Sequence, residues 1–165
     1  MSATKDICKA FTIDYNRLSS RLNSSIIVEY VSKTMDVCGL WDTGATMSCI
    51  SHEVVSTLSL IPVGRGTIQT PSGSKEVDIH LVDFILPNGV GIKGVRVYET
   101  DIGDQGIGAL IGMDIISRGD FTVTNYNGST VFTFRMPSMK VVDYVKQINA
   151  QNAIGAKHGK GKRRR

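Results

Sequence analysis

The stretch that decides the fold is Leu40-Trp41-Asp42-Thr43-Gly44-Ala45-Thr46. An apolar run ends here abruptly in a carboxylate, a hydroxyl and a glycine, and the glycine permits a tight turn with close backbone approach. The string Asp-Thr-Gly is short, and it also fits an ordinary β-turn in which the aspartate accepts a backbone hydrogen bond. The flanking sequence therefore has to distinguish a plain turn from a functional site.

Strand patterns lie on both sides of this stretch. Residues Ser25–Ser32 and Met35–Trp41 are rich in β-branched and aromatic side chains and predict a hairpin. After the turn, Thr46–Ile50 predicts a short strand, and His52–Leu60 predicts a short helix that stops before a proline. The turn thus joins strands in a β-rich context.

The middle of the chain continues as strands separated by turn residues. Further strands are predicted at 66–70, 75–86, 90–99, 109–111, 121–125 and 129–135. Pro-Asn-Gly at 87–89 and Asn-Gly at 127–128 favour hairpins, because these residues accept the backbone angles of tight turns. A helical turn is predicted from Asp114. The body is therefore expected to be mainly β.

The ends of the chain differ from this body. Residues 1–24 show no clear period and predict an irregular or partly helical lead-in, so that the folded domain spans 25–136. Residues 137–155 predict an amphipathic helix that begins near Ser138 and ends at Gly155, because Val141, Val142, Val145 and Ile148 recur at helical spacing. Residues 156–165 alternate glycine with cations, which predicts a disordered basic tail.

The composition is that of a single soluble domain, with 165 residues, 41% of them hydrophobic, and a net charge of +4. Without the tail the charge is about −2, because the tail holds Lys157, Lys160, Lys162, Arg163, Arg164 and Arg165. Such a tail can bind nucleic acid or an acidic partner by neutralising phosphates or carboxylates. No aromatic residue is interleaved for base stacking, so a merely solvated terminus is the alternative.

Other features narrow the class of protein. The first residues lack a basic stretch followed by an apolar run, and no apolar stretch is long enough for a membrane span, so neither a leader nor membrane insertion is expected. Three cysteines without a close pair favour a reduced, cytoplasmic protein. The histidines show no metal-ligand spacing, so neither a metal nor another cofactor is expected. The string G-x-G-x-x-G at 89–94 leads into a strand, which argues against dinucleotide binding.

Two ordered motifs resemble the retropepsin-like aspartic proteases, the family of the retroviral proteases and their bacterial relatives. The first is Asp42-Thr43-Gly44 followed by Ala45, and the second, Ala109-Leu110-Ile111-Gly112-Met113-Asp114-Ile115-Ile116, looks like the family's apolar-apolar-Gly-x-Asp signature. The match runs in order over roughly residues 26–125. The resemblance implies a closed β-barrel, the acid-protease half, in which a short helix at Gly112 and Asp114 packs beneath the active-site loop.

The resemblance also implies roles for single residues. Asp42 matches the catalytic carboxylate, and Thr43 matches the threonine whose hydroxyl interlocks with its mate across a dimer axis. Gly44 matches the glycine whose carbonyl accepts a substrate amide, and Ala45 supports the same loop. The tip of the hairpin formed by the predicted strands 66–70 and 75–86 matches the flap that closes over a substrate and excludes water. This tip comprises Thr70, Pro71, Ser72 and Gly73.

Chemistry requires more than one such carboxylate. Peptide hydrolysis by carboxylates needs one group as base toward water and one as acid toward the carbonyl or the departing amine. Two carboxylates held close together share a proton and titrate as a coupled pair. Because the chain has one Asp-Thr-Gly, the resemblance implies a homodimeric endopeptidase acting on polypeptides, with Asp42 from each subunit.

This sequence departs from the retroviral pattern in several places. Thr46 stands where retroviral enzymes have an acidic residue, and Met113 stands where they have an arginine, so their intersubunit ion-pair network is absent or replaced. Pro71 and Ser72 replace a glycine-rich flap tip. These departures keep open an alternative from another class, a catalytically silent dimeric binding module with a basic partner-binding tail.

Three further alternatives concern apolar residues. Trp41 fits either the core or a substrate contact. Phe132 and Phe134 fit either a dimer interface or ordinary core packing. The helix that contains Val141–Ile148 fits either packing on its own barrel or binding to a partner.

Overall fold

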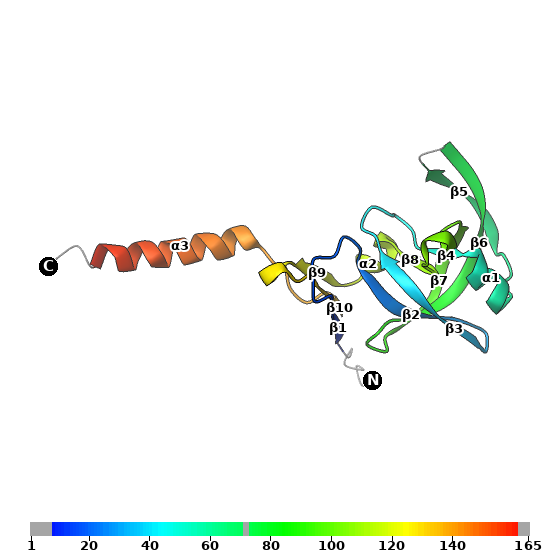
Figure 1. Cartoon of the computed structure of the whole chain (residues 1–165), viewed down its shortest axis with the longest axis horizontal. Coiled ribbons are helices and arrows are strands. Elements are labelled where there is room, and N and C mark those ends of the chain that lie inside the picture. The colour runs from blue at the N-terminus through cyan, green and yellow to red at the C-terminus, as the bar shows by residue number, and fades with distance from the viewer. Residues whose placement is uncertain (1–7, 71–72, 162–165) are drawn as a thin grey trace, which may run out of the picture.

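The structure is a computed structural model that describes residues 8–70 and 73–161 (Figure 1). Its larger sheet consists of β2 (Asn23–Tyr30), β3 (Lys33–Trp41), β4 (Cys49–Ser51), β5 (Gly64–Thr70), β6 (Gly73–Ile85), β7 (Gly91–Thr100) and β8 (Ala109–Ile111). The strand order is β2-β3-β8-β4-β7-β6-β5, and a further pairing of β2 with β6 closes six strands into a barrel. Strand β5 remains outside the ring as the outer arm of a hairpin. The predicted mainly β, closed-barrel fold is confirmed.

A second sheet of three antiparallel strands joins the two ends of the chain. Strands β1 (Lys9–Asp14), β10 (Val131–Met136) and β9 (Asp120–Thr124) lie in the order β1-β10-β9. The prediction of an irregular or partly helical lead-in is therefore wrong over β1, which pairs with β10 and buries Phe11 in the core. The predicted domain boundaries of 25–136 consequently leave out a strand of the folded body.

Aromatic side chains of this small sheet pack against Trp41 at the end of β3. The Trp41 ring lies with its centroid 5.2 Å from that of Phe132 and 4.9 Å from that of Phe134. Both phenylalanines are fully buried within the chain. Core packing is thus the correct alternative for this pair, because side chains without exposed surface have none to offer a partner.

Short helices connect the strands. Helix α1 (His52–Leu58) begins at Ser51, whose hydroxyl accepts a hydrogen bond from the Val54 amide, 3.4 Å away. Helix α2 (Met113–Ile116) follows β8, and two 3-10 turns, η1 (Gly103–Gln105) and η2 (Tyr126–Gly128), lie in loops. The predicted strand Thr46–Ile50 is shorter in the structure, because β4 begins only at Cys49 and the preceding residues bond to α2.

The C-terminal helix α3 (Tyr144–Gly161) begins and ends later than predicted. Asp143 accepts a hydrogen bond from the Lys146 amide at 3.1 Å and so occupies the capping position that was predicted for Ser138. The helix runs through Gly155 to Gly161, so the expectation of disorder is wrong over 156–161, and 162–165 lie outside the described residues.

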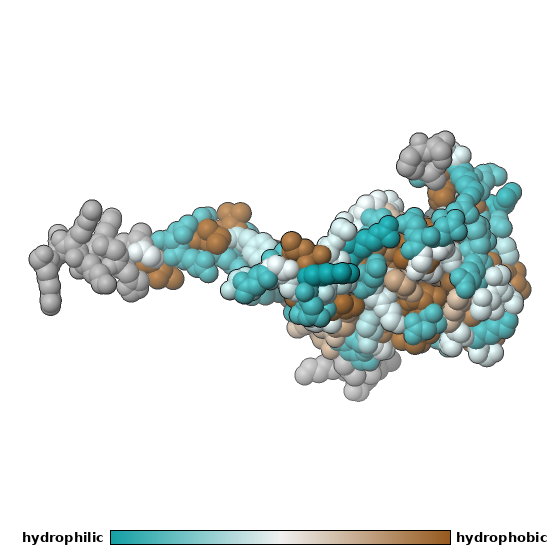
Figure 2. Space-filling view, viewed as in Figure 1, coloured by the Kyte–Doolittle hydropathy of each residue, from teal (hydrophilic) through white to brown (hydrophobic). Residues whose placement is uncertain are grey.

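Helix α3 projects away from the barrel, and its apolar side chains are visible on its surface (Figure 2). Val145, Ile148 and Ile154 are each more than half exposed, and so is Val141 in the segment before the helix. The alternative in which this helix packs on its own barrel is therefore wrong.

Asp120 ties the segment before α3 to the small sheet. Its carboxylate accepts hydrogen bonds from the Ser138 hydroxyl at 2.5 Å, from the Met139 amide at 2.9 Å and from the Arg135 guanidinium. These donors, in that order of importance, hold the pKa of Asp120 well below its ordinary value of 3.8.

We expect Asp120→Asn to lower the free energy of unfolding at neutral pH and to have no effect in strong acid. A carboxyl group with a depressed folded-state pKa contributes stability above its unfolded pKa, and this contribution is lost as the pH falls through the folded pKa. The difference between the urea unfolding midpoints of wild type and variant should shrink as the pH is lowered from about 7 to about 2. Asp104→Asn, a change of an exposed carboxylate on η1, is the control and should leave the midpoints unchanged. A difference for Asp120→Asn that is as large at about pH 2 as at about pH 7 would contradict this assignment.

Candidate active site

Asp42 lies immediately after the last residue of β3, at one end of the barrel. Its amide donates a hydrogen bond to the carbonyl of Ile111 on the parallel neighbour β8, at 3.0 Å. Its carboxylate accepts a hydrogen bond from the Gly44 amide at 2.8 Å. A Cβ at position 44 would lie 3.1 Å from the same carboxylate oxygen, so a larger residue would crowd this turn. The half-buried carboxylate is thus held in a defined orientation.

The segment Gly112-Met113-Asp114 supports the loop that carries Asp42. The Met113 amide donates to the Ala45 carbonyl at 2.8 Å, and the Asp114 amide donates to the Thr46 carbonyl at 3.2 Å. The first turn of α2 thereby satisfies two loop carbonyls that have no strand partner. The two motifs that the sequence singled out are in direct contact.

Ser48 completes this contact, although no sequence motif points to it. Its buried hydroxyl donates to the Asp114 carboxylate at 2.8 Å and accepts from the Gly112 amide at 3.1 Å. Gly112 approaches so closely that a Cβ there would lie 2.7 Å from the carbonyl carbon of Met47. A single serine six residues after Asp42 forms no motif, so its only sequence signal was its proximity to the Asp-Thr-Gly turn.

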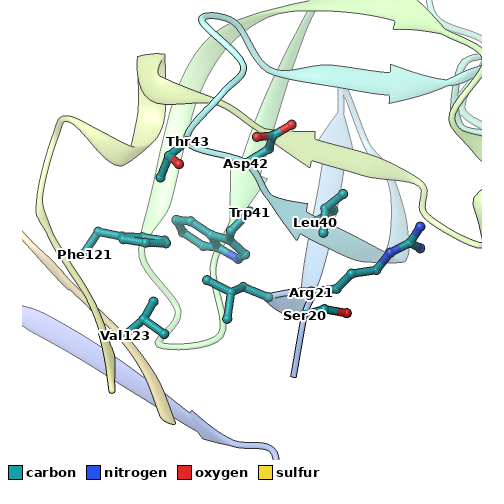
Figure 3. A pocket seen from close by; sticks show the side chains of 9 residues that line it. Ser20, Arg21, Leu40, Trp41, Asp42, Thr43, Phe121 and Val123 are labelled. Atoms are coloured by element: carbon teal, nitrogen blue, oxygen red, sulfur yellow. The ribbon is translucent and has the colours of Figure 1, made fainter. Parts of the chain in front are cut away.

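A pocket of about 420 Å³ opens beside Asp42 and Thr43 (Figure 3). Trp41 and Phe121 form its apolar wall, with ring centroids 6.2 Å apart. The indole of Trp41 is 4% exposed and donates to the Ser24 hydroxyl at 2.8 Å, so this residue belongs to the core. The remaining lining residues are Ser20, Arg21, Leu22, Leu40 and Val123.

A second pocket of about 420 Å³ lies between the Asp42 loop and the β5–β6 hairpin. Its lining comprises Gly44, Ala45, Thr46, Met47, Cys49, Thr67, Ile68, Gln69 and Tyr98. Burial raises the pKa of the Cys49 thiol, against a hydrogen bond with Thr100 that lowers it. The thiol therefore stays protonated and supplies no thiolate to this wall.

The predicted flap is a regular antiparallel hairpin. Its pairs run from Gly64 opposite Ile79 to Thr70 opposite Gly73, and Gly73 has a φ of 120° at the turn. Gly66 lets the hairpin lie against the Tyr98 ring, because a Cβ there would be 2.5 Å from a ring carbon. Pro71 and Ser72, and the side chain of Thr70, lie outside the described residues.

The structure thus places together most of the predicted site residues. Asp42, Thr43, Gly44 and Ala45 form one loop that borders both pockets, while Gly112 and Asp114 bond to the residues that follow this loop, Thr46 and Ser48. Within residues 8–70 and 73–161, no group of three or more His, Cys, Asp or Glu side chains is arranged to hold a metal ion. Among the helices of those ranges, none has the length and apolar character of a membrane span. The cytoplasmic location stays a prediction.

This architecture defines a class of protein, a single barrel that presents one aspartate beside a flap-like hairpin. The sequence profile of the family described as "Aspartyl protease" matches residues 31–115, which include both motifs. The chain belongs to the aspartyl protease family. No curated protein sequence gives a significant match.

One solved structure supports the fold, and a second is reported for comparison. A retropepsin-like aspartic protease from Rickettsia conorii is similar to 80% of this chain over 98% of its own length, with a TM-score of 0.53 and 16% identity. The EIAV protease in complex with the inhibitor HBY-793 is similar over 62% of this chain and 90% of its own, with a TM-score of 0.48 and 23% identity. The predicted resemblance to the retropepsin-like family is confirmed.

We expect Gly112→Ala to destabilise the protein by about 1–3 kcal/mol, because the new methyl group must displace the backbone of the Asp42 loop. The free energy of urea unfolding measures this loss. Gly91→Ala, at a strand position where a Cβ meets no atom within 4 Å, is the matched control and should change stability far less. Equal unfolding free energies for wild type and Gly112→Ala would show that the loop tolerates displacement.

Proposed function

We propose that the chain is an aspartic endopeptidase that acts as a homodimer, with Asp42 of each subunit at the centre of the site. The observation that carries this proposal is the fixed orientation of one carboxylate, held by Gly44 and by the hydrogen bond to Ile111, beside two pockets. The family supports the chemistry, since its members are described as aspartyl proteases.

The dimer follows from what one carboxylate lacks. Water attack on a peptide carbonyl needs a base that takes a proton from water and an acid that gives one to the carbonyl oxygen or the amine. Within the described residues, neither pocket beside Asp42 is lined by a second aspartate or glutamate. A second copy related by a twofold axis would bring in its own Asp42, so that one proton is shared between two carboxylates.

The neighbouring residues then take roles in the proposed site. Thr43 is exposed next to Asp42, as a residue that meets its mate across an axis must be. The Gly44 carbonyl would accept a substrate amide, and Ala45 would support the same loop. The hairpin of β5 and β6 would close over the peptide as a flap and exclude water.

The pocket between loop and hairpin suggests which side chains the substrate presents. Ala45, Met47, Ile68 and Tyr98 contribute apolar surface to it. We therefore expect a preference for medium-sized apolar residues next to the cleaved bond, because burial of an apolar side chain yields about 1.5–3 kcal/mol.

We expect the wild-type protein to cleave members of a diverse peptide library between about pH 4 and 7, and Asp42→Asn to abolish cleavage. The amide is close to the carboxylate in size, so the variant keeps its fold while it loses the group that shares the proton. Mass spectrometry of the products measures cleavage and reports the preferred side chains together.

Sedimentation of both proteins is the control, and we expect dimers for each. Asp36→Asn, a change of an exposed aspartate that bonds to Ser25 away from both motifs, should retain wild-type cleavage. A wild-type dimer that cleaves no peptide, or cleavage that survives in Asp42→Asn, would contradict the proposal. The first result would instead favour a catalytically silent binding module, for which salt-sensitive binding through Lys157, Lys160, Lys162 and Arg163–Arg165 is the test.

A further inference from the structure

Five charged or titratable side chains form a continuous chain between the hairpin and the barrel. The ammonium group of Lys75 on β6 lies 2.6 Å from the Asp101 carboxylate. That carboxylate lies 2.5 Å from Nε2 of His52 on α1, whose Nδ1 lies 2.5 Å from the Glu99 carboxylate on β7. Glu99 also bonds to Nε2 of His80, at 2.9 Å. None of these groups belongs to the Asp42 loop.

The geometry around His52 requires a particular charge state. Both ring nitrogens face carboxylate oxygens, and only the imidazolium form carries a proton on each nitrogen. A neutral ring would direct one lone pair at a carboxylate. His52 therefore joins Glu99 and Asp101 only as a cation.

One end of this row of five side chains is buried in the barrel, and the other end reaches the hairpin. His80 is 1% exposed and Glu99 18%, whereas the Lys75 side chain is 52% exposed. Lys75 pairs directly with Ile68 in the hairpin, and directly opposed residues of antiparallel strands project from the same face. Ile68 lines the pocket beside the Asp42 loop. The ion pair between Lys75 and Asp101 therefore also fixes the position of Ile68 in the pocket wall.

We propose that Asp101 and His52 are positioning residues of the hairpin, holding its arm against the barrel through Lys75 so that Ile68 closes the substrate pocket. The inference rests on the proposed protease function for its effect on catalysis, whereas the latch itself, defined as Lys75, Asp101, His52, Glu99 and His80, is a property of the fold. A loosened latch raises KM more than it lowers kcat, because it weakens the binding wall and leaves Asp42 untouched.

The latch has a defined pH window. The groups that face His52 are Glu99 and Asp101, with Glu53 on α1 and Asp104 on η1 bordering the same hollow, and Lys75 and His80 behind the two carboxylates. Hydrogen bonds to Glu99 and then to Asp101 raise the pKa of His52 above 6.5.

The carboxylates set the acid limit. Lys75 and then His52 lower the pKa of Asp101 below 3.8. Burial raises the pKa of Glu99, but the hydrogen bonds from His52 and His80 outweigh it and leave this pKa lowered. The contribution of His52 is complete below its unfolded pKa and is lost as the pH rises through its raised pKa, whereas that of Asp101 is lost in acid. The latch is therefore closed in weak acid.

Hydrogen exchange tests the latch without any reliance on catalysis. In Asp101→Asn and in Lys75→Gln we expect the amides of residues 64–70 and 73–79 to exchange about three- to fivefold faster than in wild type at about pH 6. The double variant should exchange no faster than either single one, because the two changes remove the same pair. Lys93→Gln, which removes a similar exposed lysine paired with Asp83 at 2.7 Å, is the matched control and should leave the hairpin unchanged.

A second set of measurements follows hairpin protection as a function of pH and the kinetics of peptide cleavage. Wild-type protection of the hairpin should fall between about pH 6 and 8, and His52→Gln should flatten this dependence. In peptide cleavage, Asp101→Asn should raise KM severalfold with a smaller change in kcat. Unchanged hairpin exchange in Asp101→Asn, or equal acceleration in Lys93→Gln, would overturn the latch. If the wild type cleaves no peptide, the proposed protease function fails, and the exchange data still decide whether the latch exists.

Discussion

The backbone of Gly112 lies so close to the loop of Asp42 that no side chain fits between them, and the site depends on this contact. The loop cannot continue as a strand, because its carbonyls at Ala45 and Thr46 point toward α2 and are satisfied there. Ser48 completes the contact, because its hydroxyl donates a hydrogen bond to Asp114, which lies 66 residues away in the sequence. The parallel pairing of β3 with β8 and the short length of β4 both follow from bringing these segments together.

The aromatic cluster extends this support to the ends of the chain. Trp41 directly precedes Asp42, and its ring packs with Phe11, Phe121, Phe132 and Phe134 from the three-stranded sheet. Tilted and edge-on ring pairs of this kind add stability beyond the area that they bury. Strand β1 therefore supports the site, because it supplies Phe11 to the aromatic cluster behind the candidate carboxylate.

Local signals in the sequence were sufficient for some elements. The Asn-Gly turn predicted the β9–β10 hairpin, and the resemblance of the Asp42 and Gly112 motifs to the retropepsin-like family implied that their segments support each other. Strand β1 was missed, since one buried residue, Phe11, between exposed ones gives no strong alternation. The helix start was misplaced because Ser138 and Asp143 are both capping residues, and only the tertiary bond to Asp120 decides between them.

The latch was invisible for a different reason. His52, His80 and Glu99 lie on α1, β6 and β7, Asp101 lies in the loop after β7, and no spacing rule connects them. They meet because closure of the barrel puts β6 beside β7 and packs α1 against the end of β7. Local propensity predicts each element here, whereas contacts between elements depend on register and closure, which a sequence read alone does not determine.

At two positions beside the Asp42 loop, this chain lacks the charged side chains of the retroviral pattern. Thr46 and Met113 carry no charge, and their backbone groups bond within the same chain, Thr46 through its carbonyl and Met113 through its amide. Hydrogen bonds between uncharged backbone groups are little affected by ionic strength, whereas exposed ion pairs are screened. These backbone hydrogen bonds hold the Asp42 loop, together with the bonds to the Asp42 and Asp114 carboxylates. Several ion pairs lie at the hairpin instead, where the proposed latch would make access to the pocket depend on solution conditions.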